Sequence, residues 1–382
     1  MGNIRASDTA NSTFTYDFHL SKNDFTCFPI GIWKRLLNHT LRDHYDELLF
    51  YGDPQGEDGL HHELATYLLR FRGVVCRKEQ IVIGAEQHLL MNYLALMLRN
   101  CASGLAVENP CYPLIHAAFQ SHGYEVFHVT EPDGGISISG LQDTGARIAA
   151  VAPSHQYPSG RVIPFNERMA LLEWAKENEA YIVEDDYGGE LRYPGQPVPA
   201  LQGIDPSANV IYIGGFSQIL APDLCIHYMV LPNNLIESFH EIRRTFVFEQ
   251  SSSRIYQRTL QRFMEQGHFE KHVRKMRNLY RRKNHMLSDA LETHFRDVGE
   301  VMNVEAGLHV ILKLQASPSE QEMVEAVRPY GIRIAAASPF YASGGALSQE
   351  RRFIIGFGGI ASERIDEGIH LLRKLWKPYL GA

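Results

Sequence analysis

The apolar residues of this chain change their spacing along its length, and the changes mark alternating helices and strands. In residues 59–73 the apolar side chains recur every three or four positions, and Gly73 ends the segment, which predicts an amphipathic helix. In residues 80–98 a short β-branched run turns at Gly84 into an apolar segment, which predicts a buried strand followed by a helix. The same alternation continues to about residue 232.

The strand segments are short, rich in valine, isoleucine and alanine, and separated by helices. This pattern is typical of a mostly parallel sheet with helices on both faces. From about residue 300 on, the pattern predicts a smaller α+β unit. We therefore predict an α/β fold with these limits: a polar N-terminal tail at 1–15, a segment packing with the smaller domain at 16–50, a large domain at 51–295 and a small C-terminal domain at 296–382.

Residues 254–296 form a long, mostly polar stretch in which seven lysines and arginines fall between Lys271 and Lys283. Such a run is compatible with a nucleic-acid patch or with a solvated helix that joins two domains. The net charge of the chain is −7, so the composition favours the joining helix.

Composition narrows the functional class. No apolar run approaches about 18 residues, which argues against a membrane span, and the N-terminus has no apolar core typical of a signal peptide. The acidic balance gives no overall footprint for DNA or RNA. The five cysteines are odd in number, with no Cys-x-x-Cys pair, which indicates a reducing, cytoplasmic compartment.

Polar segments follow the predicted strands, at the edge where parallel sheets bind ligands. The candidate site residues at these strand ends are Glu86, Gln87, Cys111, Tyr112, His155, Tyr157, Asp185, Tyr187, Ser217 and Gln218.

Several motifs occur in an order that resembles a known family. They include "YGDPQG", "ENPCYPLIHAAF", "PSHQYPSG", "VEDDYGGELRY" and "GHFEKHVRKMRNLYRRK". The chain, from about residue 16 to about 375, is similar to the aminotransferase-like domain of the MocR subfamily of GntR-type bacterial transcription regulators. The resemblance implies the fold type I architecture of pyridoxal-phosphate enzymes and a homodimer with each pocket at the subunit interface. In this family a winged helix-turn-helix precedes the domain; the first dozen residues here are polar and predict none, so we expect DNA contacts only through a segment this chain lacks.

The resemblance assigns roles to retained pocket residues. Asp185 matches the carboxylate that pairs with the pyridine nitrogen, and Tyr187 matches the phenol facing the ring's 3-oxygen. Tyr112 matches the aromatic residue that stacks on the ring, although it is equally compatible with a core position. Tyr51 matches the tyrosine that reaches across the dimer towards the phosphate. Tyr157, after His155 and Gln156, stands where aminotransferases carry an asparagine.

Other positions depart from the family pattern. Gln218, after Ser217, replaces the lysine that forms the imine, and an amide cannot form that bond. Cys225 stands where the family has a phosphate-binding arginine, and Glu86 lies in the loop that otherwise cradles the phosphate. Gly359 occupies the position of a carboxylate-binding arginine that many members lack.

The free energies of these changes indicate how strongly they weaken phosphate binding together. Losing a bidentate arginine removes roughly 1.5–3 kcal/mol, and a carboxylate about 4 Å from the phosphate costs on the order of 4 kcal/mol at an effective dielectric near 20. These two changes alone weaken phosphate binding by about four orders of magnitude. We therefore interpret the cofactor site as dismantled, with no covalently bound cofactor.

Three functions remain open. The first is a dimeric, non-enzymatic effector domain that binds another small molecule. The second is an aminotransferase relative or regulator domain that holds pyridoxal phosphate noncovalently, and the third is a dimerisation scaffold with an empty cleft. Because Glu86 and Asp185 lack a basic partner in this pattern, an amine-bearing or cationic effector fits best. A metal site is disfavoured, since the spacing of the acids, histidines and cysteine matches no metal motif.

Overall fold

The computed structural model describes residues 14–19, 22–130, 135–194, 198–245, 251–342 and 350–380. Most of the predicted tail at 1–15 lies outside the described residues. Within the described ranges, every helix is too short or too polar to cross a lipid bilayer.

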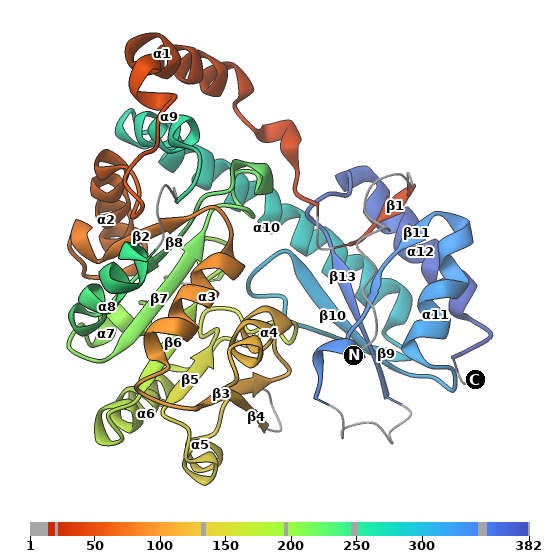
Figure 1. Cartoon of the computed structure of the whole chain (residues 1–382). Coiled ribbons are helices and arrows are strands. Elements are labelled where there is room, and N and C mark those ends of the chain that lie inside the picture. The colour runs from red at the N-terminus through yellow and green to blue at the C-terminus, as the bar shows by residue number, and fades with distance from the viewer. Residues whose placement is uncertain are drawn as a thin grey trace.

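A seven-stranded sheet forms the larger part of the molecule (Figure 1). Its strands are β2 (Ile81–Gly84), β3 (Gly104–Asn109), β4 (Glu125–Thr130), β5 (Ile148–Val151), β6 (Tyr181–Asp185), β7 (Val210–Gly215) and β8 (His227–Val230). They lie in the order β2-β8-β7-β6-β5-β3-β4. The five strands from β4 to β7 run parallel, whereas β8 is antiparallel to both of its neighbours. The predicted α/β fold with a mostly parallel sheet is confirmed.

Helices cover both faces of this sheet because successive strand residues point to opposite sides. On β6, Val183 packs into a core shared with α3 (Gln87–Leu98), α4 (Pro113–Ser121) and α8 (Asn233–Arg244). The preceding Ile182 packs into a second core shared with α5 (Ile138–Thr144), α6 (Phe165–Glu177) and α7 (Leu201–Ile204). With both faces buried, the parallel strands read as continuous apolar runs rather than as alternating ones.

A smaller antiparallel sheet lies beside the larger one, in the order β12-β13-β10-β9. Its strands are β9 (Gly299–Met302), β10 (His309–Gln315), β12 (Ala335–Ala336) and β13 (Glu350–Gly356), and its helices are α11 (Glu320–Val327) and α12 (Ile365–Trp376). The buried Trp376 packs its ring 4.5 Å from that of Phe353. A separate parallel pair joins β1 (Tyr16–Asp17) to β11 (Ile332–Arg333). Short 3₁₀ helices are η2 (Phe25–Cys27), η3 (Lys78–Gln80), η4 (Pro222–Leu224), η5 (Arg328–Tyr330), η6 (Ser338–Phe340) and η7 (Ser362–Arg364).

The polar stretch 254–296 forms two helices, α9 (Arg254–Glu265) and α10 (His268–Phe295), which meet at Gly267. Gly267 has a φ of 69°, a conformation that favours glycine. The expectation of a simply solvated helix was wrong for Lys283, which is buried and forms an ion pair of 2.7 Å with Asp24. Its charge is therefore used to hold the N-terminal segment against α10.

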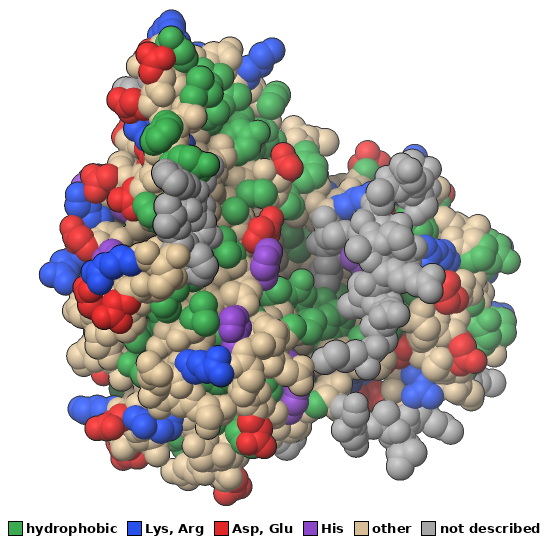
Figure 2. All heavy atoms as spheres, in the orientation of Figure 1, with side chains coloured by type: hydrophobic (Ala, Val, Ile, Leu, Met, Phe, Trp, Pro, Cys, Tyr) green, Lys and Arg blue, Asp and Glu red, His purple; other side chains and the backbone are tan. Residues whose placement is uncertain are grey.

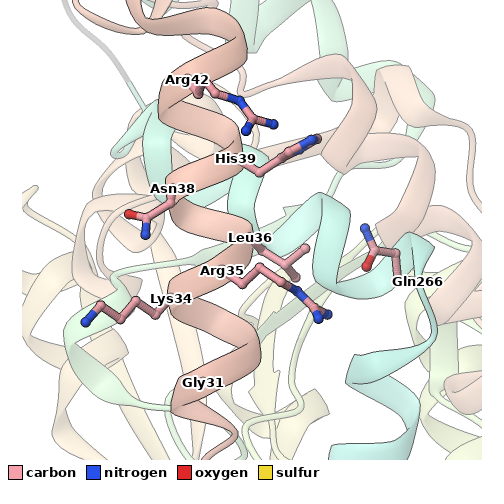
Figure 3. Close-up of a pocket in the computed structure, with 8 residues that line it drawn as sticks. All are labelled: Gly31, Lys34, Arg35, Leu36, Asn38, His39, Arg42 and Gln266. Atoms are coloured by element: carbon pink, nitrogen blue, oxygen red, sulfur yellow. The ribbon is translucent and has the colours of Figure 1, made fainter.

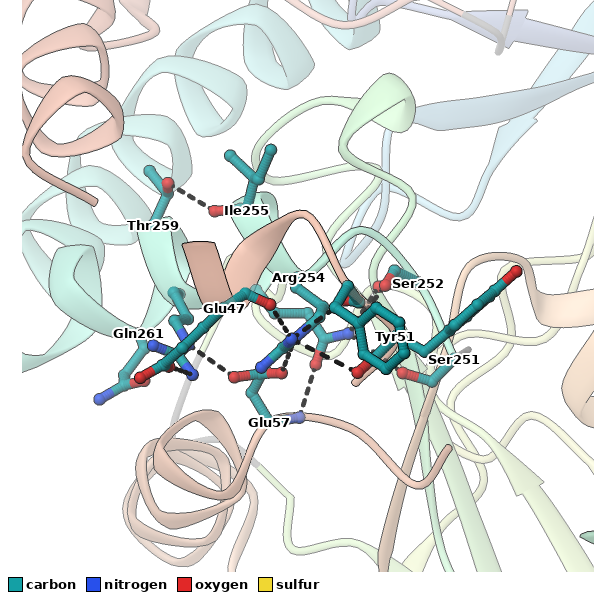
Figure 4. Close-up of polar contacts among 12 residues, drawn as sticks. Glu47, Tyr51, Glu57, Ser251, Ser252, Arg254, Ile255, Thr259 and Gln261 are labelled. Atoms are coloured by element: carbon teal, nitrogen blue, oxygen red, sulfur yellow. Dashed lines mark hydrogen bonds and ion pairs between the residues drawn. The ribbon is translucent and has the colours of Figure 1, made fainter. Parts of the chain in front are cut away.

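The N-terminal segment contacts both parts of the molecule. β1 lies with the smaller sheet, whereas α1 (Ile30–Leu48) packs on α9 (Figure 1). The start of α2 (Asp58–Arg72) is tied to α9 by Glu57, whose two carboxylate oxygens accept from Arg254 at 2.7 Å and Arg258 at 2.6 Å (Figure 4). Although burial opposes it, these two ion pairs hold the pKa of Glu57 below its ordinary value. The domain limits drawn from the sequence stay a prediction.

Candidate ligand site

Asp185 ends β6 at the carboxyl edge of the parallel strands. Its Oδ1 accepts a hydrogen bond of 3.0 Å from Nε2 of Gln87, the first residue of α3. Burial raises the pKa of Asp185 to about 7, with the hydrogen bond from Gln87 opposing the rise and the charge of Asp186 adding to it. The Asp185 carboxyl therefore titrates near neutral pH, and a cation bound beside it would favour its ionised form.

Tyr187 is bonded to a buried histidine. Its hydroxyl lies 2.6 Å from Nδ1 of His155, and His155 packs 5.0 Å from the ring of His309 on β10. Burial, and then the neighbouring His309, hold the pKa of His155 well below its ordinary value, so the imidazole is neutral. Burial and the charge of Asp185 raise the pKa of Tyr187 well above its ordinary value. The phenol of Tyr187 therefore has a hydrogen-bond partner within the chain, the imidazole of His155.

Aromatic rings continue from Tyr187 towards the smaller-sheet part of the chain. Tyr157 lies 6.4 Å from Tyr187, 5.4 Å from Tyr112 and 4.8 Å from Phe340 of η6, each pair in an edge-to-face arrangement. Tyr112 is 49% exposed, and burial and Asp185 raise the pKa of its hydroxyl. Because Phe340 and His309 come from the smaller-sheet part of the chain, this ring cluster joins the two parts.

Gln218 follows β7 and Ser217. Its Oε1 is buried and has no hydrogen-bond partner among the described residues. A Cβ placed on Gly188 would lie 3.1 Å from this oxygen, so the Gln218 amide lies against the turn that follows Tyr187. The carbonyl of Ser217 accepts a hydrogen bond of 2.5 Å from Nδ2 of Asn23. An unpaired buried acceptor is costly, so a donor at this place would be favourable.

Two of the departures from the family pattern lie in contact with each other. Glu86 precedes α3, and its Oε1 accepts from Sγ of Cys225 at 3.6 Å. Burial and then Glu86 raise the pKa of the Cys225 thiol. The Nδ1 atom of His227 lies 3.2 Å from the carbonyl oxygen of Ala85, the residue before Glu86. The ring of His227 fills the place where a Cβ on Gly215 would lie. Within the described ranges, no lysine or arginine forms an ion pair with Glu86.

Several buried polar residues around the site were not predicted from the sequence. Asp186, next to Asp185, accepts at 2.5 Å from both Arg72 and the hydroxyl of Tyr212, and this network fixes the turn after β6. Glu108, at the end of β3, accepts from the backbone nitrogen of Ala152 at 2.9 Å. The paired aspartates at 185–186 were a signal for the first network; nothing in the local pattern distinguished Glu108.

Tyr51 lies apart from the ring cluster. It is 50% exposed and packs 5.5 Å from the ring of Phe50, with its carbonyl near Arg254 (Figure 4). The structure therefore brings together Glu86, Gln87, Tyr112, His155, Tyr157, Asp185, Tyr187, Gln218 and Cys225 in adjoining contacts, while Tyr51 stands at the surface.

The residues present do not fit covalently held pyridoxal phosphate. Position 218 offers an amide oxygen without a donor in place of an amine. The helix N-terminus that would bind the phosphate carries the Glu86 carboxylate, bonded to Cys225. Asp185 alone suits the pyridine nitrogen, so no reaction step is assigned to this cofactor. No cluster of three or more metal-binding side chains occurs in the described part of the chain.

Comparison with known proteins identifies the family. The model of aminotransferase class I and II matches residues 18–370. The chain belongs to this family. An uncharacterized HTH-type transcriptional regulator of Bacillus subtilis, YdeL, is 35% identical over 94% of this chain, which spans 77% of that protein. The probable rhizopine catabolism regulatory protein MocR of Rhizobium meliloti is 29% identical over 93% of this chain and 71% of its own length. The resemblance to MocR-type regulators is thus confirmed.

Solved structures agree on the fold. A kynurenine aminotransferase of Pyrococcus horikoshii has a TM-score of 0.85 at 23% identity, covering 97% of this chain and 93% of that one. At this identity the likeness shows the fold type I architecture alone.

Proposed function

We propose that this chain is a non-catalytic, ligand-sensing effector domain of a MocR-type regulator, and that its ligand is an amine-bearing or cationic small molecule. The observation that carries the proposal is Gln218: the side chain at the lysine position presents a buried acceptor without a donor. Without an amine there, the imine on which aminotransferase chemistry depends cannot form.

Three carboxyl groups at the candidate site support an amine-bearing or cationic ligand. Burial raises the pKa of Asp185 to about 7 and that of Glu108 to about 8, and Oε1 of Glu108 has no hydrogen-bond partner among the described residues. Glu86 adds a third carboxyl, bonded only to a thiol in the contacts described above. A ligand that donates N–H bonds would satisfy these acceptors, and a positive charge would ionise Asp185. An anionic ligand would offer these acceptors no donor.

The proposal includes a homodimer. The side chains of Tyr45, Leu49, Phe50 and Tyr51 are 57%, 75%, 68% and 50% exposed. Hydrophobic side chains also gather on the surface over α1 and α9 (Figure 2). A cluster of large apolar side chains around the end of α1 is the kind of surface that a second copy covers.

The second candidate is a domain that holds pyridoxal phosphate noncovalently. The retained Asp185, Tyr187 and Tyr112 favour it, because they match the residues that would face the pyridine ring. Against it stand Glu86 and Cys225 at the phosphate position.

A thermal-shift series on the purified protein at pH 7.5 tests the proposal. Small primary amines are compared with carboxylates and alcohols of the same carbon skeleton, in the native chain and in Asp185→Asn. We expect at least one amine to raise the melting temperature of the native chain, and the Asp185→Asn variant to lose that shift. If carboxylates stabilise the protein and amines do not, the proposed ligand class is wrong.

A further inference from the structure

A basic groove on the surface lies along α1. This groove of about 700 Å³ runs between the first turns of α1 and the junction of α9 and α10. Its polar lining consists of Lys34, Arg35, Asn38, His39, Arg42 and Gln266. Three cations and no carboxylate line it, on a chain whose net charge is −7.

The cations of this groove are available to a ligand. Lys34 and Arg35 are exposed and form no ion pair with the described residues. Arg42 is 74% exposed and meets one carboxylate oxygen, that of Asp43, at the long distance of 3.4 Å. Asp43 is already shared with Arg262 at 3.3 Å and with His39 at 3.2 Å. The Asp43 carboxylate is therefore shared between Arg42, Arg262 and His39, and the lining of the groove keeps an excess of positive charge from Lys34, Arg35 and Arg42.

Helical spacing aligns these groups. Arg35, His39 and Arg42 are three and four residues apart, so their side chains extend to the same side of α1, towards Gln266 (Figure 3). Arg35 and Arg42 are seven residues apart, which places their positions along the helix about 10 Å from each other. Such a row suits two or more anionic groups in series better than a single ion.

The charge of Arg35 also acts on a histidine of α10. His268, at the start of α10, has its pKa lowered by burial, and then by the charges of Lys271 and Arg35. Arg35 of α1 and Lys271 of α10 thus both act on the start of α10.

We propose that this groove binds a ligand with consecutive phosphate groups through Arg35 and Arg42, with a further contact to Lys34, which extends to another side of α1 (Figure 3). Guanidinium groups donate paired hydrogen bonds to phosphate oxygens. The source of such phosphates is a polyphosphate anion or the backbone of a nucleic acid. A nucleic-acid contact here would depart from the expectation that DNA is bound only through a winged helix. The net charge of −7 describes the whole chain and does not report a local cluster of positive side chains.

The test has two arms, with the purified chain at 50 mM and 200 mM salt. Inorganic tripolyphosphate is titrated by calorimetry, and a duplex DNA of arbitrary sequence by fluorescence anisotropy. If three cations each release a counterion, DNA affinity falls by about 40-fold between the two salt concentrations. In Arg35→Ala/Arg42→Ala the same fall is only about fourfold. Binding of the anion alone identifies a small polyphosphate ligand, and binding of DNA identifies the backbone.

A matched control uses Lys374→Ala/Lys377→Ala, which removes two exposed cations at the end of α12. The control should bind like the native chain, and Lys34→Ala should weaken binding less than the Arg35/Arg42 pair does. Melting temperature and light scattering verify that each variant keeps its fold and assembly. The proposal is overturned if neither probe binds at 50 mM salt, or if the control weakens binding as much as the groove variant.

Discussion

The thiol of Cys225 donates a hydrogen bond to the carboxylate of Glu86 across 3.6 Å, in the loops where the resemblance in sequence predicts a phosphate site. Two changes that are 139 positions apart in the sequence thus form one contact. A phosphate at this place would have to displace the thiol and approach the carboxylate. The contact therefore links the two departures into a single alteration of the site.

The first prediction concerns Asp185 and pH. The folded protein holds the pKa of this carboxyl at about 7, above its ordinary value of 3.8. The unfolded chain therefore loses the proton first as pH rises, and the folded state is destabilised progressively from about pH 4 to about pH 7. Asp185→Asn should thus raise the melting temperature above pH 7 and change it little at pH 4, with a gain of a few kcal/mol at most.

The control for this measurement is Asp143→Asn, which neutralises an exposed carboxylate at the end of α5. Its effect should not follow this pH profile. A gain for Asp185→Asn that is equal at pH 4 and pH 8 would contradict the assignment of a neutral Asp185 carboxyl at low pH.

The second prediction concerns the hydroxyl of Tyr187. Tyr187→Phe removes its 2.6 Å hydrogen bond and leaves Nδ1 of the buried His155 without this partner. We expect a loss of about 1–3 kcal/mol in the free energy of unfolding, measured by urea denaturation. Tyr112→Phe makes the same change in a half-exposed side chain and should cost less than about 0.5 kcal/mol. Equal costs for the two variants would refute the buried bond.

Some of the site was predictable from the sequence, and some was not. Asp185, Tyr187 and Gln218 could be placed together because parallel strands end at one edge of a sheet. His309 and Phe340 were not anticipated, because they come from another part of the chain and a single sequence gives periodicity but no pairing between distant segments. The same limit applies to Lys283, whose burial depends on Asp24, 259 positions away.

The third prediction concerns assembly. Phe50→Asp places a charge in the apolar surface around the end of α1, where Phe50 is 68% exposed. If a second copy covers this surface, burying the unpaired carboxylate should raise the dimer dissociation constant at least tenfold in light scattering. Leu69→Asp, at a 57% exposed position on α2, is the control and should leave assembly unchanged. A native chain that is monomeric at tens of micromolar would contradict the homodimer itself.

The fourth prediction concerns rebuilding the family's site. Gln218→Lys alone should not hold pyridoxal phosphate, because Glu86 remains at the phosphate position and Cys225 offers no positive charge. The triple variant Gln218→Lys, Cys225→Arg and Glu86→Gly should become yellow with the cofactor. Borohydride should then fix the cofactor to residue 218, as detected by peptide mass. A folded triple variant that stays colourless would show that these three positions do not define the site.

A titration of the native protein with pyridoxal phosphate, followed by absorbance and by thermal shift, tests whether the cofactor site is dismantled. With Gln218 in place of the lysine and Glu86 beside Cys225, we expect no new absorbance band and no saturable change in melting temperature at micromolar cofactor. A saturable shift with micromolar affinity would contradict the dismantled site and establish a noncovalent cofactor-binding domain instead.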